Sequence, residues 1–257
     1  MQWEKLTFKD IEKLSKEDTI VVIPIGSMEI HGPHLPLGTD ALVIYKLALE
    51  VAKREEALVL PPIYYACAVE NRHFPGNISL KAEIFLELIE SLCDEIGRNG
   101  FKKILILNGH GGNKRSLSLF IRELLWKKKR YQVYILMDPW SPIADVIDSI
   151  KETEEIGHAC EIETSFILYL FPELAKLEEV KDKAKTGSAP KIPYIETSVD
   201  WISYCIEGYL GDPRKASKEK GSILFNKWVE RVSKVIRAIK EDKITERVLE
   251  AYFKRVG

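Results

Sequence analysis

Residues 103–113 read Lys-Ile-Leu-Ile-Leu-Asn-Gly-His-Gly-Gly-Asn, an apolar run that leads directly into a glycine-rich turn. A short continuous apolar run bounded by turn residues is typical of a strand buried on both faces of a parallel sheet. The glycines permit a sharp turn after Leu107, and an amphipathic stretch over about 114–128 follows them. The segment therefore predicts a strand, a tight turn and a helix.

The same alternation of strand and helix continues on both sides of this segment. Apolar residues at the matching period predict strands over 19–25, 57–60 and 132–138, and helices over about 40–54, 81–98, 218–242 and 244–256. Such alternation implies right-handed crossovers, so we predict an α/β fold: a three-layer α/β/α sandwich with a mostly parallel sheet. Residues 181–217 lack this period, and we interpret them as a long excursion, a lid or a subunit contact, within a single domain of residues 1–257.

The composition excludes several classes of protein. The chain has 257 residues, with 38 basic and 39 acidic side chains and a formal charge of −1, so nucleic acid and anionic membranes are not expected partners. It has no apolar run of about 18 residues and no secretory signal pattern, so we expect a soluble cytoplasmic protein. Its four cysteines include no Cys-x-x-Cys pair, which argues against a disulfide scaffold or a thiolate zinc site.

Histidines occur where the predicted topology places ligands. In parallel sheets the ligand crevice lies beyond the carboxyl ends of the strands. His31 and His110 follow two of the predicted strands, and imidazole is a common metal ligand and general base. The alternative is that the five histidines of the chain are scattered by chance.

The loop after the first predicted strand carries three candidate ligands. Residues 26–40 read Gly-Ser-Met-Glu-Ile-His-Gly-Pro-His-Leu-Pro-Leu-Gly-Thr-Asp. In an extended segment alternate side chains share a face, so Glu29 and His31 can point at one ion. Asp40 opens the next helix, and its side chain can return to the same ion. The alternatives are a surface ion pair between Glu29 and His31 and a plain helix N-cap at Asp40.

Two further segments add candidates. His110 lies between glycines and is expected to be accessible as a ligand; the alternative, a phosphate-binding turn, lacks the Gly-Lys-Ser/Thr ending of a P-loop. If a helix begins at about Gly157, His158 and Glu161 are three residues apart and share a face. Glu163 would then lie on roughly the opposite side and make a supporting or structural contact. An ordinary charge pair between His158 and Glu161 is the alternative.

Together these residues predict a metal-activated hydrolase. Carboxylate and imidazole ligands without thiolates suit Zn²⁺, Mn²⁺ or Fe²⁺. Asp40 can bridge two such ions about 3.5–4 Å apart, with a hydroxide nucleophile between them. His158 would transfer protons.

With these residues assembled, the chain resembles the creatininase superfamily, creatinine amidohydrolase and its relatives, from about Thr19 to Gly221. The resemblance rests on residues 29–36, Thr39-Asp40, His73-Phe74-Pro75-Gly76, 108–113, 158–165, Gly211-Asp212-Pro213 and Glu219-Lys220-Gly221. It implies an α/β/α fold, two divalent metal ions, and hydrolysis of carbon–nitrogen bonds in amides other than ordinary peptides. It also implies a small-molecule amide substrate and a homo-oligomer, hexameric in creatininase itself.

By position in the family's motifs, Glu29, His31, Asp40 and His110 match metal ligands, and His158 matches the catalytic histidine. Creatininase proper has a glutamate ligand where this chain has Gly112, and we propose Glu161 to complete the second ion.

The double glycine at 111–112 is similar to the pattern of one branch of the family. That branch contains a formamidopyrimidine-nucleotide deformylase of flavin and deazaflavin synthesis and a peptide-trimming relative. The predicted function is therefore a metal-dependent amidohydrolase that cleaves a cyclic or formyl amide through a metal-bound hydroxide. The alternatives are the nucleotide deformylase, or a non-enzymatic metal- or nucleotide-binding module.

Overall fold

A computed structural model describes residues 1–190 and 192–256. In this part of the chain four strands form one sheet in the order β2-β1-β3-β4: β1 (Ile20–Ile25), β2 (Leu58–Val59), β3 (Lys103–Asn108) and β4 (Gln132–Leu136). All of these pairings are parallel, and β1 pairs with β3 from Ile20 opposite Lys103 to Ile25 opposite Asn108. The predicted α/β class with a parallel sheet is confirmed.

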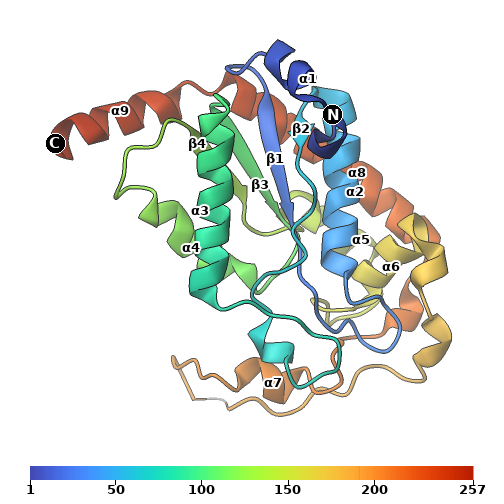
Figure 1. Ribbon diagram of the computed structural model, residues 1–257. Helices are drawn as coiled ribbons and strands as arrows, with labels where there is room; N and C mark the ends of the chain where they lie inside the picture. The colour runs from blue at the N-terminus through green and yellow to red at the C-terminus, as the bar shows by residue number, and fades with distance from the viewer. Residues whose placement is uncertain (191, 257) are drawn as a thin grey trace.

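Helices cover both faces of this sheet (Figure 1). One face packs against α2 (Thr39–Glu55), α5 (Ala144–Ile150), α6 (Glu161–Leu170) and α8 (Lys218–Glu241). The other face packs against α3 (Ala82–Arg98) and α4 (Asn113–Glu123). The remaining α-helices are α1 (Phe8–Lys13), α7 (Asp200–Tyr204) and α9 (Ile244–Val256), and short 3₁₀ turns include η1 (Trp3–Lys5), η2 (Val69–Asn71), η3 (Ser141–Ile143), η4 (Pro172–Leu174), η5 (Leu177–Glu179) and η6 (Pro213–Lys215).

The two central strands explain the two cores. Successive side chains of a strand point to opposite faces, so a strand between two helical layers must be apolar throughout. Val22 and Leu105 enter the core beneath α2 and α8, whereas Val21 and Ile104 enter the core beneath α3 and α4. The apolar runs of the sequence are therefore buried from both sides.

Several predicted boundaries differ from the observed ones, among them the strand predicted over 132–138, which ends at Leu136. β2 has two residues, fewer than the predicted strand over 57–60. α4 ends at Glu123, before the predicted end at about 128, and the basic run 127–130 that follows has like charges at helical spacing. α6 begins at Glu161 and not at about Gly157, which changes the geometry of the site described below.

The strand arrows run toward one side of the molecule, and the described part of the predicted excursion that contains α7 passes beyond these carboxyl ends of the strands (Figure 1). No helix in the described residues is both long and apolar enough to cross a membrane. A cytoplasmic location stays a prediction.

Candidate metal centre

Glycines that follow β1 and β3 allow the start of α2 to pack directly against the carboxyl ends of these two strands. A Cβ atom at Gly26 would lie 2.2 Å from the backbone nitrogen of Ala41, and one at Gly109 would lie 2.9 Å from the carbonyl oxygen of Asp40. Neither distance is compatible with a side chain at these positions. The first turn of α2 therefore returns to the strand ends and carries Asp40 between the two loops.

The structure brings Glu29, His31, Asp40 and His110 together in a buried cluster. Asp40 lies at its centre: Oδ1 is 3.1 Å from Nε2 of His31, and Oδ2 is 3.0 Å from Nδ1 of His110. Oε1 of Glu29 is 2.7 Å from the same His110 nitrogen. Each oxygen of Asp40 thus faces a different imidazole.

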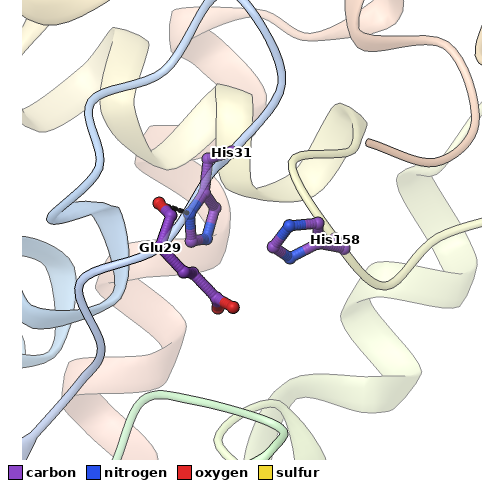
Figure 2. A group of neighbouring side chains, drawn as sticks. All are labelled: Glu29, His31 and His158. Carbon is purple, nitrogen blue, oxygen red and sulfur yellow. Dashed lines mark hydrogen bonds between the residues drawn. The ribbon is translucent and has the colours of Figure 1, made fainter. Parts of the chain in front are cut away.

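His158 lies beside this cluster. Its ring faces that of His31 with centroids 4.5 Å apart, next to the carboxylate of Glu29 (Figure 2). Nε2 of His158 is 2.8 Å from the carbonyl oxygen of Ile30. Because a carbonyl only accepts, Nε2 is the donor, and in the neutral ring Nδ1 is then the free acceptor.

The sixth member of the cluster is Glu163. Its Oε2 is 3.7 Å from Nε2 of His31 and accepts a hydrogen bond from the backbone of Ala159. The ligand atoms fall into compact groups within 4.8 Å, among them Glu29–Asp40–His110 and His31–Asp40–Glu163. These two groups share Asp40. Buried carboxylates and imidazoles at this spacing fit divalent cations, and the sharing fits two adjacent ions with Asp40 between them.

Glu161 lies elsewhere, and the structure does not bring it to the cluster. Its carboxylate accepts hydrogen bonds from the backbone nitrogens of Glu152 and Thr153 at 3.0 and 2.9 Å, and it pairs with Lys220. Glu161, predicted from the sequence to complete the second ion, therefore lies outside the cluster, and Glu163 lies inside it.

The start of α6 explains this exchange. Ala159 has a φ of 44°, in the left-handed region, and Cys160 is extended, so the helix cannot begin before Glu161. His158 consequently precedes the helix and does not share a face with Glu161. The two glutamates do face opposite sides, as a helical rotation of about 200° over two residues requires. It is Glu163 that faces the cluster.

Burial and mutual charge determine the protonation of the cluster. Burial disfavours the charge of Glu29, but the field of His110, its hydrogen bond and the field of His158 together outweigh burial and lower the pKa of Glu29. Burial likewise opposes a charge on His31, yet Asp40 raises its pKa to about 10. Burial raises the pKa of Glu163 to about 8.

Burial, together with the charge of His31, lowers the pKa of His158 to about 4. His158 is therefore a neutral base at neutral pH. Among the described residues, no lysine or arginine pairs with the carboxylates of Glu29, Asp40 and Glu163, so only imidazoles offset their charge.

Two polar residues that sequence reasoning missed orient the carboxylates. The hydroxyl of Ser27 lies 2.7 Å from Oδ2 of Asp40 and 3.1 Å from Oε1 of Glu29. Nδ2 of Asn71 donates to Oε2 of Glu29 at 2.8 Å. Ser27 lies in the loop over 26–40, two residues before Glu29, so its place in the sequence could have indicated a contact with that carboxylate. Nothing in the sequence links Asn71 to Glu29.

A cavity of about 790 Å³ opens onto the cluster. Glu29, Asp40, His110, His158 and Glu163 line its floor, and its walls include Glu70, Lys114, Arg115, Glu154, Glu155, Glu196, Asp200, Trp201 and Tyr204. The two glycines after His110 differ at this cavity. A Cβ atom at Gly111 would meet open space, whereas one at Gly112 would lie 2.4 Å from Nε2 of His110.

Fold and site together define an α/β protein with a buried carboxylate–imidazole cluster at the carboxyl edge of its sheet. Residues 4–236 match the family model described as Creatininase: Creatinine amidohydrolase. The chain belongs to the creatininase family, and the family prediction is confirmed.

Relatives of known activity act on different substrates. The chain is 28% identical over 249 residues to a creatinine amidohydrolase of Pseudomonas putida, covering 91% of this chain and 95% of the relative. It is 28% identical over 264 residues to a 3-dehydro-scyllo-inosose hydrolase of Thermotoga maritima, covering 93% of this chain and 83% of the relative. It is 30% identical over 220 residues to a mycofactocin precursor peptide peptidase of Mycolicibacterium smegmatis, covering 82% and 81%.

A shorter match, 36% identity over 106 residues and 41% of this chain, is to a 2-amino-5-formylamino-6-ribosylaminopyrimidin-4(3H)-one 5'-monophosphate deformylase of Methanococcus voltae, 40% of which is covered. Family membership therefore indicates a hydrolase without fixing the bond that is cleaved.

Solved creatininase structures share the fold. A creatininase described as the Mn form superposes with a TM-score of 0.80 at 26% identity, over 94% of this chain and 99% of that chain. A mutant creatininase described as the Zn-Zn type superposes with a TM-score of 0.79 at 26% identity, over 94% and 98%. The descriptions of these relatives name the metals that the donor set of this chain fits.

Proposed function

We propose that residues 1–257 form one metal-dependent hydrolase domain that cleaves the carbon–nitrogen bond of a non-peptide amide, cyclic or formyl. The observation that carries the proposal is the sharing of Asp40 between two groups of ligand atoms, Glu29–Asp40–His110 and His31–Asp40–Glu163. Among the described residues, the three buried carboxylates of the cluster, Glu29, Asp40 and Glu163, have no lysine or arginine partner. Two divalent cations, Zn²⁺, Mn²⁺ or Fe²⁺, would offset their charge.

Each residue of the cluster has a role in this proposal. Bound cations would polarise the amide carbonyl and lower the pKa of a water molecule. Asp40 would hold both ions, with Glu29 and His110 on one side and His31 and Glu163 on the other. His158, neutral because its pKa lies near 4, would accept a proton at Nδ1 and deliver it to the departing nitrogen.

The size and lining of the cavity favour a substrate larger than a small lactam. The cavity volume of about 790 Å³ is in the range of pockets that hold drug-sized molecules, larger than a small lactam needs. The cationic side chains of Lys114 and Arg115 reach its wall, although each is paired with an acid, Asp138 and Glu196 respectively. This combination supports, as a second candidate, a formamidopyrimidine nucleotide as substrate. A peptide is the third class that the relatives suggest.

Metal analysis followed by an amide panel tests the proposal. The purified chain would be stripped of metal, reloaded with Zn²⁺, Mn²⁺ or Fe²⁺, and assayed with creatinine, small lactams, the formamidopyrimidine nucleotide and a short peptide. We expect near two equivalents of bound metal and metal-dependent hydrolysis of one amide class. Release of formate from the nucleotide alone would select the second candidate.

Other outcomes would contradict the proposal. Tight metal binding without hydrolysis of any amide would indicate a metal-binding module. Nucleotide binding that persists after metal removal would indicate a phosphate-binding role for the turn at 109–112.

We also propose that the chain forms a homo-oligomer, as the family resemblance implies. α9 lies outside the matched residues 4–236, and it exposes Ile244, Val248 and Tyr252 at a spacing of four residues along one side. Figure 1 shows this helix extending away from the sheet. The molar mass in solution, measured by light scattering, distinguishes a monomer from a hexamer.

A further inference from the structure

Asn71 links the candidate metal centre to the segment that covers it. Its side chain is only 3% exposed, at the end of η2. Nδ2 donates to Oε2 of Glu29 at 2.8 Å, and Oδ1 accepts from Nε1 of Trp201 at 3.2 Å. The other oxygen of Glu29 contacts His110. A continuous path of hydrogen bonds therefore joins α7 to the cluster.

The two partners of Asn71 fix the orientation of its amide. A carboxylate can only accept a hydrogen bond, and an indole N–H can only donate one. Asparagine carries a donor group, the NH₂, and an acceptor, the carbonyl oxygen, at the same reach, so it satisfies Glu29 and Trp201 at once. Aspartate would present an oxygen to Glu29 and add a buried negative charge, and alanine would leave Oε2 of Glu29 and Nε1 of Trp201 without this partner.

Polar contacts hold α7 in place. None of its residues is fully buried, and the carbonyl oxygen of Tyr204 accepts a hydrogen bond from the backbone of Gly187. The Trp201 ring lies edge to face against the His158 ring, with centroids 5.6 Å apart. Tyr204 adds a hydrogen bond to Glu155 at the exposed surface. The Trp201 contacts with Asn71 and His158 are thus the ones that tie α7 to the floor of the cavity.

We propose that Asn71 is a positioning residue with two simultaneous effects: it orients the Glu29 carboxylate for metal binding, and it seats Trp201 over His158. Since one amide makes both contacts, metal binding at Glu29 and closure of α7 over the cavity favour each other, and the coupling is reciprocal. The inference rests on the proposed role of Glu29 as a metal ligand.

Hydrogen exchange of the full-length protein tests this coupling. The amides of Ser203 and Cys205 bond to carbonyls at Val199 and Trp201, and they report on whether α7 is formed. Zn²⁺ would be titrated into the metal-free wild type and the variants Asn71→Ala and Trp201→Phe, with affinity read from a competing chelator. In the wild type we expect Zn²⁺ to slow exchange of these amides.

The variants separate the two contacts of Asn71. Asn71→Ala should weaken Zn²⁺ affinity by about 10–100-fold, the usual effect of losing a partner of a metal ligand. It should also abolish the slowing at saturating Zn²⁺. Trp201→Phe keeps a ring against His158 but loses the N–H, so it should reduce the slowing and change affinity less. Trp126→Phe, at a tryptophan that is 79% exposed, is the matched control and should change neither.

Two results would overturn the proposal, and they differ from a failure of the proposed function. The first is that Asn71→Ala binds Zn²⁺ with wild-type affinity and that Zn²⁺ slows exchange of the α7 amides as much as in the wild type. Asn71 would then be only structural. If Asn71→Ala does not fold, unchanged slowing in Trp201→Phe would still refute the coupling. A wild type that binds no metal would instead refute the metal centre before any variant is compared.

Discussion

Glu161 and Glu163 leave the first turn of α6 in opposite directions and enter two differently constructed charge clusters. The Glu161 carboxylate is fully buried, and it meets Lys220, two backbone N–H groups and the hydroxyl of Thr153. The Glu163 carboxylate, also buried, meets His31 and the backbone N–H of Ala159, with Asp40 nearby. In the first cluster Lys220 supplies the positive charge that offsets Glu161. In the second, only imidazoles face the carboxylates.

This difference distinguishes a carboxylate with a fixed counter-charge, Glu161, from a candidate metal ligand, Glu163. Burial raises the pKa of Glu161, but the hydrogen bonds from Lys220, Thr153 and the backbone together outweigh burial, and the pKa ends below its ordinary value. Burial prevails at Glu163, and its pKa is about 8. A buried carboxylate that the protein leaves without a fixed cation is the better candidate ligand, whatever its position in a motif.

The largest expected effect is the loss of Asp40. Because both ligand groups share its carboxylate, Asp40→Ala should remove both ions, and turnover should fall by on the order of 10⁴-fold or more, a large part of an enzyme's rate acceleration. Metal content and amide hydrolysis measure this. Asp148→Ala, at an exposed aspartate paired with Lys151, is the control. Full activity in metal-free Asp40→Ala would show that the cluster is not the reactive centre.

Removal of Lys220 should act on stability and not on metal. Lys220→Met leaves Glu161 buried without its cation, which typically costs about 3–5 kcal/mol. Chemical denaturation measures the free energy of unfolding, and a chelator competition should show unchanged metal affinity. Lys227→Met, on the same helix but in an exposed pair with Glu230, should cost less than about 1 kcal/mol. A drop in metal affinity in Lys220→Met would place Glu161 back among the ligands.

The two glutamates should give the metal-free protein opposite dependences on pH. Glu161 has a lowered pKa when folded, so its contribution is present above the ordinary glutamate range and is lost as pH falls through the folded pKa. Glu163, with a folded pKa near 8, stays protonated while the unfolded chain ionises, so stability falls as pH rises from about 4.5 to 8. Denaturation of Glu161→Gln and Glu163→Gln across this range tests both signs. In metal-free protein at pH 8, Glu163→Gln should be the more stable of the two; the reverse order would contradict the assignment.

The smallest effects should distinguish the two glycines beside His110. Neither has a positive φ, so alanine introduces no backbone strain at either position. Gly112→Ala must displace the His110 ring, and we expect about tenfold weaker metal binding, the lower end for perturbing a ligand's surroundings. Gly111→Ala extends into the open cavity and should stay within about twofold of wild type. Equal affinities in both variants would mean that His110 can move freely.

Much of the molecule was predictable from local pattern. The apolar runs around Val22 and Leu105 predict strands buried on both faces. Because His31 and His110 follow those strands, a parallel topology brings them to the same end of the sheet. Asp40 was predictable because a short glycine- and proline-rich loop limits how far the chain can travel before α2. Asn71 was not predictable, since its contact with Glu29 depends on how η2 packs between two distant loops.

The amino-acid sequence by itself determined the core strands, the long helices, their order, and the loops that carry Glu29, His31, Asp40 and His110, because periodicity and turn residues act over a few neighbours. Only the tertiary structure decided which glutamate of α6 faces the cluster. Ala159 adopts a left-handed conformation that delays the helix to Glu161, and that start sets the rotation of every later side chain. A rotation of about 200° between Glu161 and Glu163 then turns one toward Lys220 and the other toward Asp40.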